Sequence, residues 1–82
     1  MLKIERIYAQ GASVTTQKIT GFKDGELRKL KDLPHTQAEG LLIRMLDERN
    51  DGTGSQWKNK YGILGLWFDN EAAYVNIGKP CD

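Results

Sequence analysis

One stripe of apolar residues at helical spacing constrains the fold of this chain more than any other feature. Five residues recur at the i, i+3, i+4, i+7, i+8 spacing of a buried helix face: Ala38, Leu41, Leu42, Met45 and Leu46. Thr36 and Glu39 have the spacing of a capping box, in which both side chains accept hydrogen bonds from free backbone N–H groups. Gly52 predicts that the helix ends near Asn50. A helix with one apolar face needs a second layer, which the rest of the chain must supply.

The segment before this helix predicts a β-hairpin and a short helix. Leu2 to Ala9 alternates apolar and polar residues with a slip at Ile7, which indicates a strand with a bulge or, alternatively, a short helix. Residues 10–12 are a plausible turn, and the β-branched run in residues 13–22 is typical of a strand. A short helix then follows over residues 25–33, with Asp24 as its cap and Pro34 as its stop.

The segment after the main helix predicts a second hairpin. Tyr61 to Phe68 is nearly continuous in apolar residues, which is typical of a central strand covered on both faces. Asp69-Asn70 favours a turn, and Ala72 to Ile77 alternates as a strand. We therefore expect an α+β fold over residues 1–82 as a single small domain. Its element order is β-β-α-α-β-β, an antiparallel sheet of about four strands with one main amphipathic helix packed on one face.

Composition narrows the function classes. Twelve basic and eleven acidic residues give a net charge of +1, which argues against a strongly electrostatic nucleic-acid binder. Cys81 is the only cysteine, so no disulfide forms within one chain, and a reducing compartment is indicated. Lys3, Glu5 and Arg6 interrupt any signal-peptide pattern, and no apolar run is long enough to cross a bilayer. We expect a cytoplasmic protein with no membrane partner, and a monomer and a homodimer both remain open.

No catalytic or metal-binding constellation is visible. His35, the only histidine, lacks a convincing nucleophile, because Cys81 is next to the end of the chain and the serines lie in ordinary turn contexts. The segment from Asp47 to Lys58 resembles a calcium loop only faintly. Arg49 and Lys58 stand where its ligands belong. We expect a protein that is not an enzyme and that has no cofactor or metal.

A glycine-rich segment, residues 50–61, is the first candidate for a binding site. It ends in four residues that we expect to contact a partner: Trp57, Lys58, Lys60 and Tyr61. Tryptophan and tyrosine are enriched at interface hot spots, and they also stack on nucleic-acid bases. The alternative is that Trp57 and Tyr61 fold back into the core at the start of the next strand.

Two further surfaces are candidates. A basic run provides a nucleic-acid site or, alternatively, the solvated face of the short helix: Lys23, Arg28, Lys29 and Lys31. Ile43 falls on the opposite side of the main helix from the apolar stripe, where it is an ordinary exposed residue or a dimer contact. The edge of the sheet is the other surface through which a dimer would form.

These features predict a small non-catalytic protein-binding module whose partner is another protein. Small stand-alone domains of this kind are common among phage and mobile-element accessory proteins, which suggests an inhibitor or adaptor of a host protein. The alternative is a nucleic-acid-binding domain that combines the basic helix face with the aromatic-lysine loop.

Overall fold

The computed structural model describes residues 2–8 and 14–78. Within these residues the strands are β1 (Lys3–Tyr8), β2 (Val14–Thr20), β3 (Ile63–Phe68) and β4 (Ala73–Gly78). The helices are α1 (Glu26–Asp32), α2 (His35–Arg49), α3 (Thr53–Gln56) and the π-helical turn η1 (Trp57–Tyr61). The expected turn at residues 10–12 and Cys81 lie outside the described residues.

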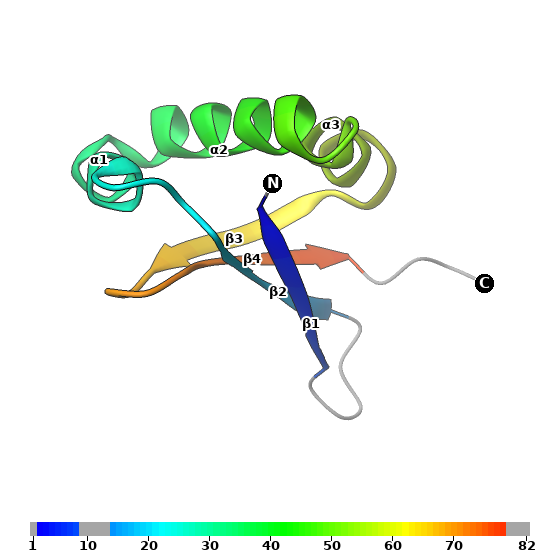
Figure 1. Cartoon of the computed structure of the whole chain (residues 1–82). Helices are drawn as coiled ribbons and strands as arrows, with labels where there is room; N and C mark the ends of the chain where they lie inside the picture. Colours follow the sequence, from blue (N-terminus) through cyan, green and yellow to red (C-terminus); the bar gives the residue numbers. More distant parts are fainter. Residues whose placement is uncertain (1, 9–13, 79–82) are drawn as a thin grey trace.

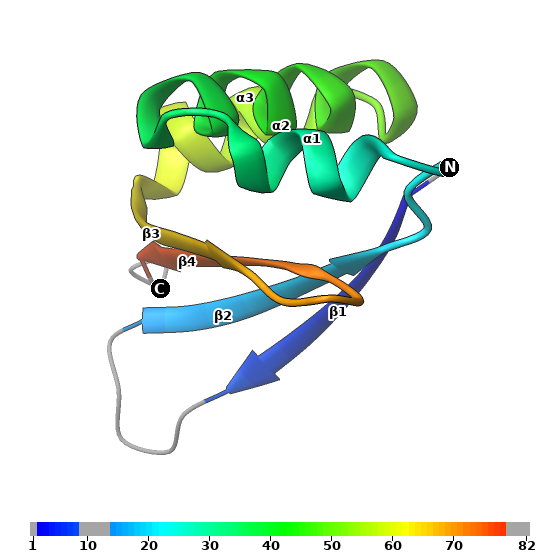
Figure 2. The ribbon, with the colours of Figure 1, turned by 90° about the vertical axis from the view of Figure 1, so that its left-hand side faces the viewer.

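The four strands form one antiparallel sheet in the order β1-β2-β4-β3. Each hairpin keeps its own strands adjacent, and β2 pairs with β4 to join the two hairpins. The helices cover one face of this sheet (Figures 1 and 2). The α+β prediction of a four-stranded antiparallel sheet with helices on one face is confirmed.

The core fills the space between the helices and the covered face. Alternate residues of β2 and β4 are buried there, including Ile19, Val75 and Ile77. The apolar stripe of α2 packs against them as predicted, with Ala38, Leu42, Met45 and Leu46 buried, while Leu41 is partly buried at its margin. The helical spacing of the stripe and the two-residue alternation of the strands therefore meet at one interface.

The start of α2 differs from the prediction. The helix begins at His35 with Pro34 as its N-cap residue, and no side chain caps it. The Thr36–Glu39 capping box is therefore wrong, because both residues already lie inside the helix. Pro34 does end α1, since Leu33 before it is extended with ψ 150°. Asp24 does not cap α1 either, because the N-cap residue is Gly25 with φ 82°.

The first strand is a regular one. β1 pairs with β2 without a break from Lys3 to Tyr8, so the bulge expected at Ile7 is absent from this pairing. The slip in the sequence pattern instead leaves Ile7 on the uncovered face, where it is 43% exposed. A single exposed apolar side chain is ordinary on a protein surface, so the pattern does not require a bulge.

The run expected to be a central strand is an edge strand. β3 pairs only with β4 and ends the sheet. Leu64 is 63% exposed and Trp67 is 44% exposed, so the strand is not covered on both faces. A bulge between Ile63 and Gly65 shifts the register of this strand, as its glycines suggested.

The predicted glycine-rich loop is helical. α3 and η1 occupy most of it, and the N–H of Gly62 donates to the carbonyl oxygen of Trp57 at 2.8 Å, a π-helical bond. Gly54 makes this arrangement accessible. A Cβ atom at Gly54 would lie 2.3 Å from the carbonyl oxygen of Ile43, so α3 crosses α2 in backbone contact.

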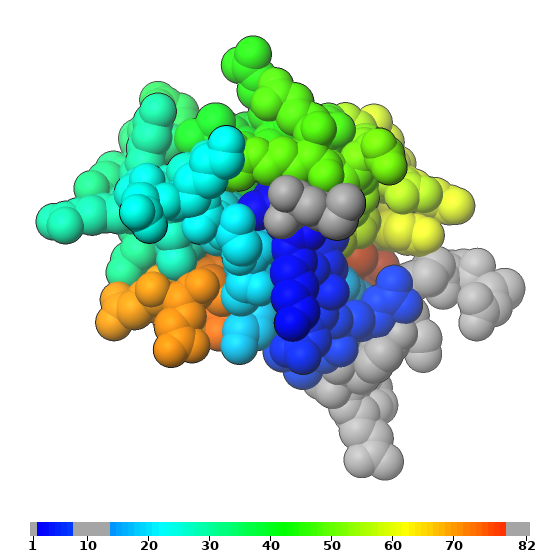
Figure 3. Space-filling model, viewed as in Figure 1, coloured from blue at the N-terminus to red at the C-terminus, as the bar shows by residue number. Residues whose placement is uncertain are grey.

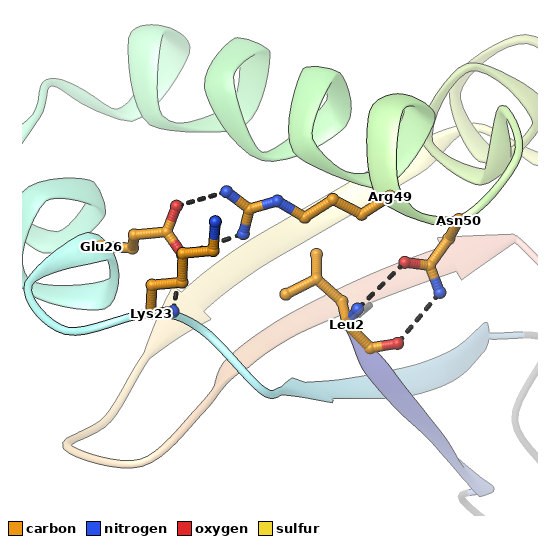
Figure 4. A network of polar contacts seen from close by, with 5 residues as sticks. All are labelled: Leu2, Lys23, Glu26, Arg49 and Asn50. Atoms are coloured by element: carbon orange, nitrogen blue, oxygen red, sulfur yellow. Dashed lines mark hydrogen bonds and ion pairs between the residues drawn. The ribbon is translucent and has the colours of Figure 1, made fainter.

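Two sets of polar contacts join the end of α2 to the start of the first strand and to α1 (Figure 4). The Asn50 side chain accepts a hydrogen bond from the N–H of Leu2 at 3.3 Å and donates to its carbonyl oxygen at 3.0 Å. Arg49 donates two hydrogen bonds to the carboxylate of Glu26, at 2.9 and 2.5 Å. Neighbouring residues at the end of α2 therefore hold β1 and α1 in place.

Candidate interaction surface

The four residues predicted to contact a partner do not form one exposed surface. Trp57 is only 7% exposed and belongs to the core, where it lines a small apolar pocket with Leu46 and Leu66. Tyr61 is partly buried against the same core, and Lys58 and Lys60 are exposed. Of the two alternatives for Trp57, the structure supports the core, so its ring cannot supply contact area to a partner.

The basic run is also divided. Lys23, Arg28, Lys29 and Lys31 are all exposed, but they do not line one site. Arg28 and Lys31 line a hollow that contains Asp32 and Asp69. Lys29 lines another, between α1 and α2, together with the charge-paired residues of Figure 4. Each hollow contains both signs of charge, so the run forms no continuous basic surface.

Ile43 does not project freely into solvent. It is partly buried and lines the apolar pocket beside Trp57, and its backbone touches Gly54 of α3. The sequence pattern placed it opposite the stripe, but α3 packs back on α2 and covers that side. The structure thus removes the exposure that suggested a dimer contact at Ile43.

The uncovered face of the sheet brings together residues that the sequence left scattered. Cross-strand pairing aligns one row across all four strands: Glu5, Lys18, Tyr74 and Trp67. The next row is Ile7, Thr16, Asn76 and Gly65. We call these two rows the open face. None of the described helices covers it (Figure 2).

Two aromatic rings dominate the open face. Trp67 and Tyr74 stack with their ring centroids 5.4 Å apart and their planes 7° from parallel. Both rings therefore sit in a fixed arrangement at the β3–β4 end of the row. Such a pair contributes about 0.5–1.5 kcal/mol beyond the area that it buries.

The hairpin turn holds the Tyr74 side chain. The Tyr74 hydroxyl donates to the carboxylate of Asp69 at 2.6 Å. The N–H groups of Glu71 and Ala72 also donate to that carboxylate. The Tyr74 hydrogen bond, followed by the backbone ones, holds the pKa of Asp69 below its ordinary value. The same bond raises the pKa of Tyr74. The turn predicted at Asp69-Asn70 thus also bonds the tip of the Tyr74 side chain.

Polar contacts order the rest of the open face, and its charges are mixed. The Thr16 hydroxyl donates to the side-chain oxygen of Asn76 at 2.8 Å. At the β1–β2 end, a shallow hollow of about 240 Å³ is lined by Lys3, Glu5, Lys18 and Thr20. Ordered aromatic rings beside charges of both signs resemble the centre and rim of a protein interface more than a phosphate-binding surface.

No group of three or more His, Cys, Asp or Glu residues in the described ranges could hold a metal ion. His35 lies exposed at the first residue of α2. Asp47 accepts hydrogen bonds from the hydroxyl and the N–H of Ser55, which lower its pKa and fix α3 to α2. No helix within residues 2–8 and 14–78 has the length and apolar character needed to span a membrane.

Comparison with protein-family models, with curated proteins and with solved structures gives no match. The function must therefore be argued from the residues of this chain.

Sequence reasoning placed the aromatic contact at Trp57 and missed Trp67. Trp67 lies within a nearly continuous apolar run, which is typical of a buried strand. The alternation of Ala72 to Ile77 already separated Tyr74 from Val75. Only the pairing of Trp67 with Tyr74, which depends on the hairpin register, shows that the two rings share the uncovered face.

Proposed function

We propose that this protein is a small non-catalytic protein-binding module that contacts its partner through the open face. The observation that supports this proposal best is the ordered Trp67–Tyr74 stack on a sheet face that none of the described helices covers. Aromatic rings that are already fixed in place lose little conformational entropy on binding, and they are typical interface anchors. An inhibitor or an adaptor acts in this way, by occupying a surface of another protein.

The charges beside the stack favour a protein partner over a nucleic acid. Lys18 is adjacent to Tyr74 in the row, but Glu5 is adjacent to Lys18, and Asp69 lies at the same rim. A nucleic-acid surface concentrates positive charge to neutralise phosphates. The basic residues of α1 belong to the helical layer on the other side of the sheet, and where Arg28 and Lys31 reach the β3–β4 turn they lie beside the acidic Asp69.

Site-directed photocrosslinking in the native host tests the proposal. A crosslinking side chain in place of Lys18, in the middle of the open face, should form a discrete protein adduct. The same side chain in place of Lys29, on α1, is the matched control and should not form that adduct. Adducts only from the α1 position, or none from either, would contradict binding through the open face.

Substitutions in the central strands then test which side chains contribute. Tyr74→Ala and Lys18→Glu should each weaken capture of the crosslinked partner at least about tenfold, because they remove an anchor or reverse a charge. Lys29→Glu on α1 should not change capture. If purified chain instead bound single-stranded RNA or DNA with an affinity that fell steeply with salt, the nucleic-acid alternative would replace this proposal.

A further inference from the structure

The outer edge of β3 is exposed and has no charge of its own. Among the described residues, no backbone hydrogen bond reaches this edge from outside the β3–β4 ladder. The strand contains neither a charged residue nor a proline, and it carries both Leu64 and Trp67, which are exposed. Such an edge invites pairing with another strand.

Two hydrogen bonds fix which residues of β3 direct their backbone groups outward. The N–H of Asp69 donates to the carbonyl oxygen of Ala72, and the N–H of Gly78 donates to that of Gly62. Bonded and non-bonded pairs alternate in an antiparallel ladder. Gly65 and Trp67 therefore direct their backbone groups toward β4, whereas Leu66 directs its own toward the free edge.

We propose that β3 pairs antiparallel with β3 of a second copy of this chain, about a twofold axis at Leu66. In this register Leu66 lies opposite the second copy's Leu66, and their outward N–H and C=O groups bond to each other. Trp67 then lies opposite the second copy's Gly65, on the open face. A glycine leaves room for the indole ring, which in turn covers the glycine backbone.

The charges at the two ends of β3 match this arrangement. Lys58 and Lys60 lie in η1 before the strand, and Asp69 and Glu71 lie in the turn after it, all exposed. A twofold antiparallel pairing brings the basic end of each copy beside the acidic end of the other. The same pairing at β1 is disfavoured, because it would bring together the charged residues of two copies: Lys3, Glu5 and Arg6. Charged side chains protect an edge strand from pairing.

This inference does not rest on the proposed function. Dimerisation uses the backbone of β3, whereas partner capture is tested at Lys18 and Tyr74 in the two central strands. If both hold, the two open faces become one continuous surface across the dimer.

Light scattering and sedimentation equilibrium of the intact chain test the pairing. The wild type should form a dimer that dissociates on dilution. Leu64→Lys should raise the dimer Kd at least about tenfold, because Leu64 lies opposite the second copy's Phe68 in this register and a lysine on an edge strand opposes pairing. Ile7→Lys is the matched control, because it makes the same change at an exposed apolar residue of the other edge strand. It should leave the Kd unchanged, and circular dichroism should show both variants folded.

Charge reversal at the strand ends provides a second, independent test. Lys60→Glu and Glu71→Lys should each weaken the dimer, and the double variant should restore it. A wild type that stays monomeric at high concentration would overturn the proposal. So would a dimer that survives Leu64→Lys, one that Ile7→Lys breaks, or charge reversals that do not compensate each other.

Discussion

The two edge strands of the sheet are stabilised and protected in different ways. β1 carries three charged side chains in six residues and is tied to the end of α2 by the two hydrogen bonds of Asn50. Figure 3 shows β1 in blue along the surface beneath the green helix α2. β3 carries no charge, and its support comes from apolar packing against Trp57 and α2. The β1 edge thus carries charge and has polar contacts in addition to the core packing of Leu2 and Ile4, whereas the β3 edge carries no charge and packs only through apolar side chains.

The two edges therefore differ in their ability to pair with another strand. A charged edge resists pairing with other strands, whereas an uncharged one permits it. The open face changes in the same direction, from Glu5 and Lys18 at the β1–β2 end to the stacked rings at the β3–β4 end. The exposed aromatic rings are therefore concentrated at the β3–β4 end of the open face.

The largest expected effect separates the two tryptophans near β3. Trp57→Ala should lower the free energy of unfolding by about 3–5 kcal/mol, because it empties a buried site between α2 and the sheet. Trp67→Ala should cost no more than about 1.5 kcal/mol, since that ring is half exposed and loses chiefly its stack. Urea unfolding of both variants measures the difference. Equal losses would contradict the assignment of one ring to the core and the other to the surface.

A smaller loss of stability, confined to the β1 side, is expected when Asn50 is replaced. Asn50→Ala removes both hydrogen bonds to the buried residue Leu2 and should cost about 1–3 kcal/mol. Hydrogen exchange should accelerate at the amides of β1 more than at those of β3. Asn59→Ala, at an exposed residue of η1, is the matched control and should change neither. Uniform acceleration across the sheet would mean that Asn50 does not act as a tether for β1.

Local sequence signals predicted the elements well and their order in space poorly. The stripe of α2, the two hairpins and the stop at Pro34 depend on residues close in sequence, and all are confirmed. The apolar run at β3 predicts a central strand, but β3 is an edge strand of the sheet. Long-range packing decides which strand of each hairpin pairs with the other hairpin. The apolar character of a single segment does not reveal this choice.

The candidate site shows the same limit. Trp57 and Trp67 both follow glycine-containing segments, and nothing within a few residues of either one distinguishes core from surface. The distinction comes from the contact between Gly54 and α2, which turns the predicted loop into a helix and carries Trp57 inward. How two consecutive helices pack against each other leaves no pattern in the few residues around Trp57.

Acid should weaken the contact between α1 and α2. The hydrogen bonds from Arg49 lower the pKa of Glu26 from its ordinary value of 4.5 to about 2. Because the folded-state pKa is depressed, the pair stabilises the fold above pH 4.5, and this contribution is lost as the pH falls toward 2. Glu26→Gln should therefore destabilise the protein near neutral pH and lose less stability than the wild type across that window. Urea midpoints measured through the acid range give both slopes, and parallel slopes would show that this pair does not titrate as described.

The smallest effect is expected at the Tyr74 hydroxyl, which bonds to the hairpin turn, whereas the Tyr74 ring stacks on Trp67. Tyr74→Phe removes the hydroxyl that donates to Asp69 but keeps the ring on Trp67. The pKa of Asp69 should rise toward its ordinary value, because its largest stabilising contact is lost. NMR titration of the carboxyl group measures that rise, and the Trp67 environment should stay almost unchanged. Tyr74→Leu, which removes the stacked ring as well, should alter the Trp67 signals strongly. If the two variants disturbed Trp67 equally, the hydroxyl and not the stack would position the indole.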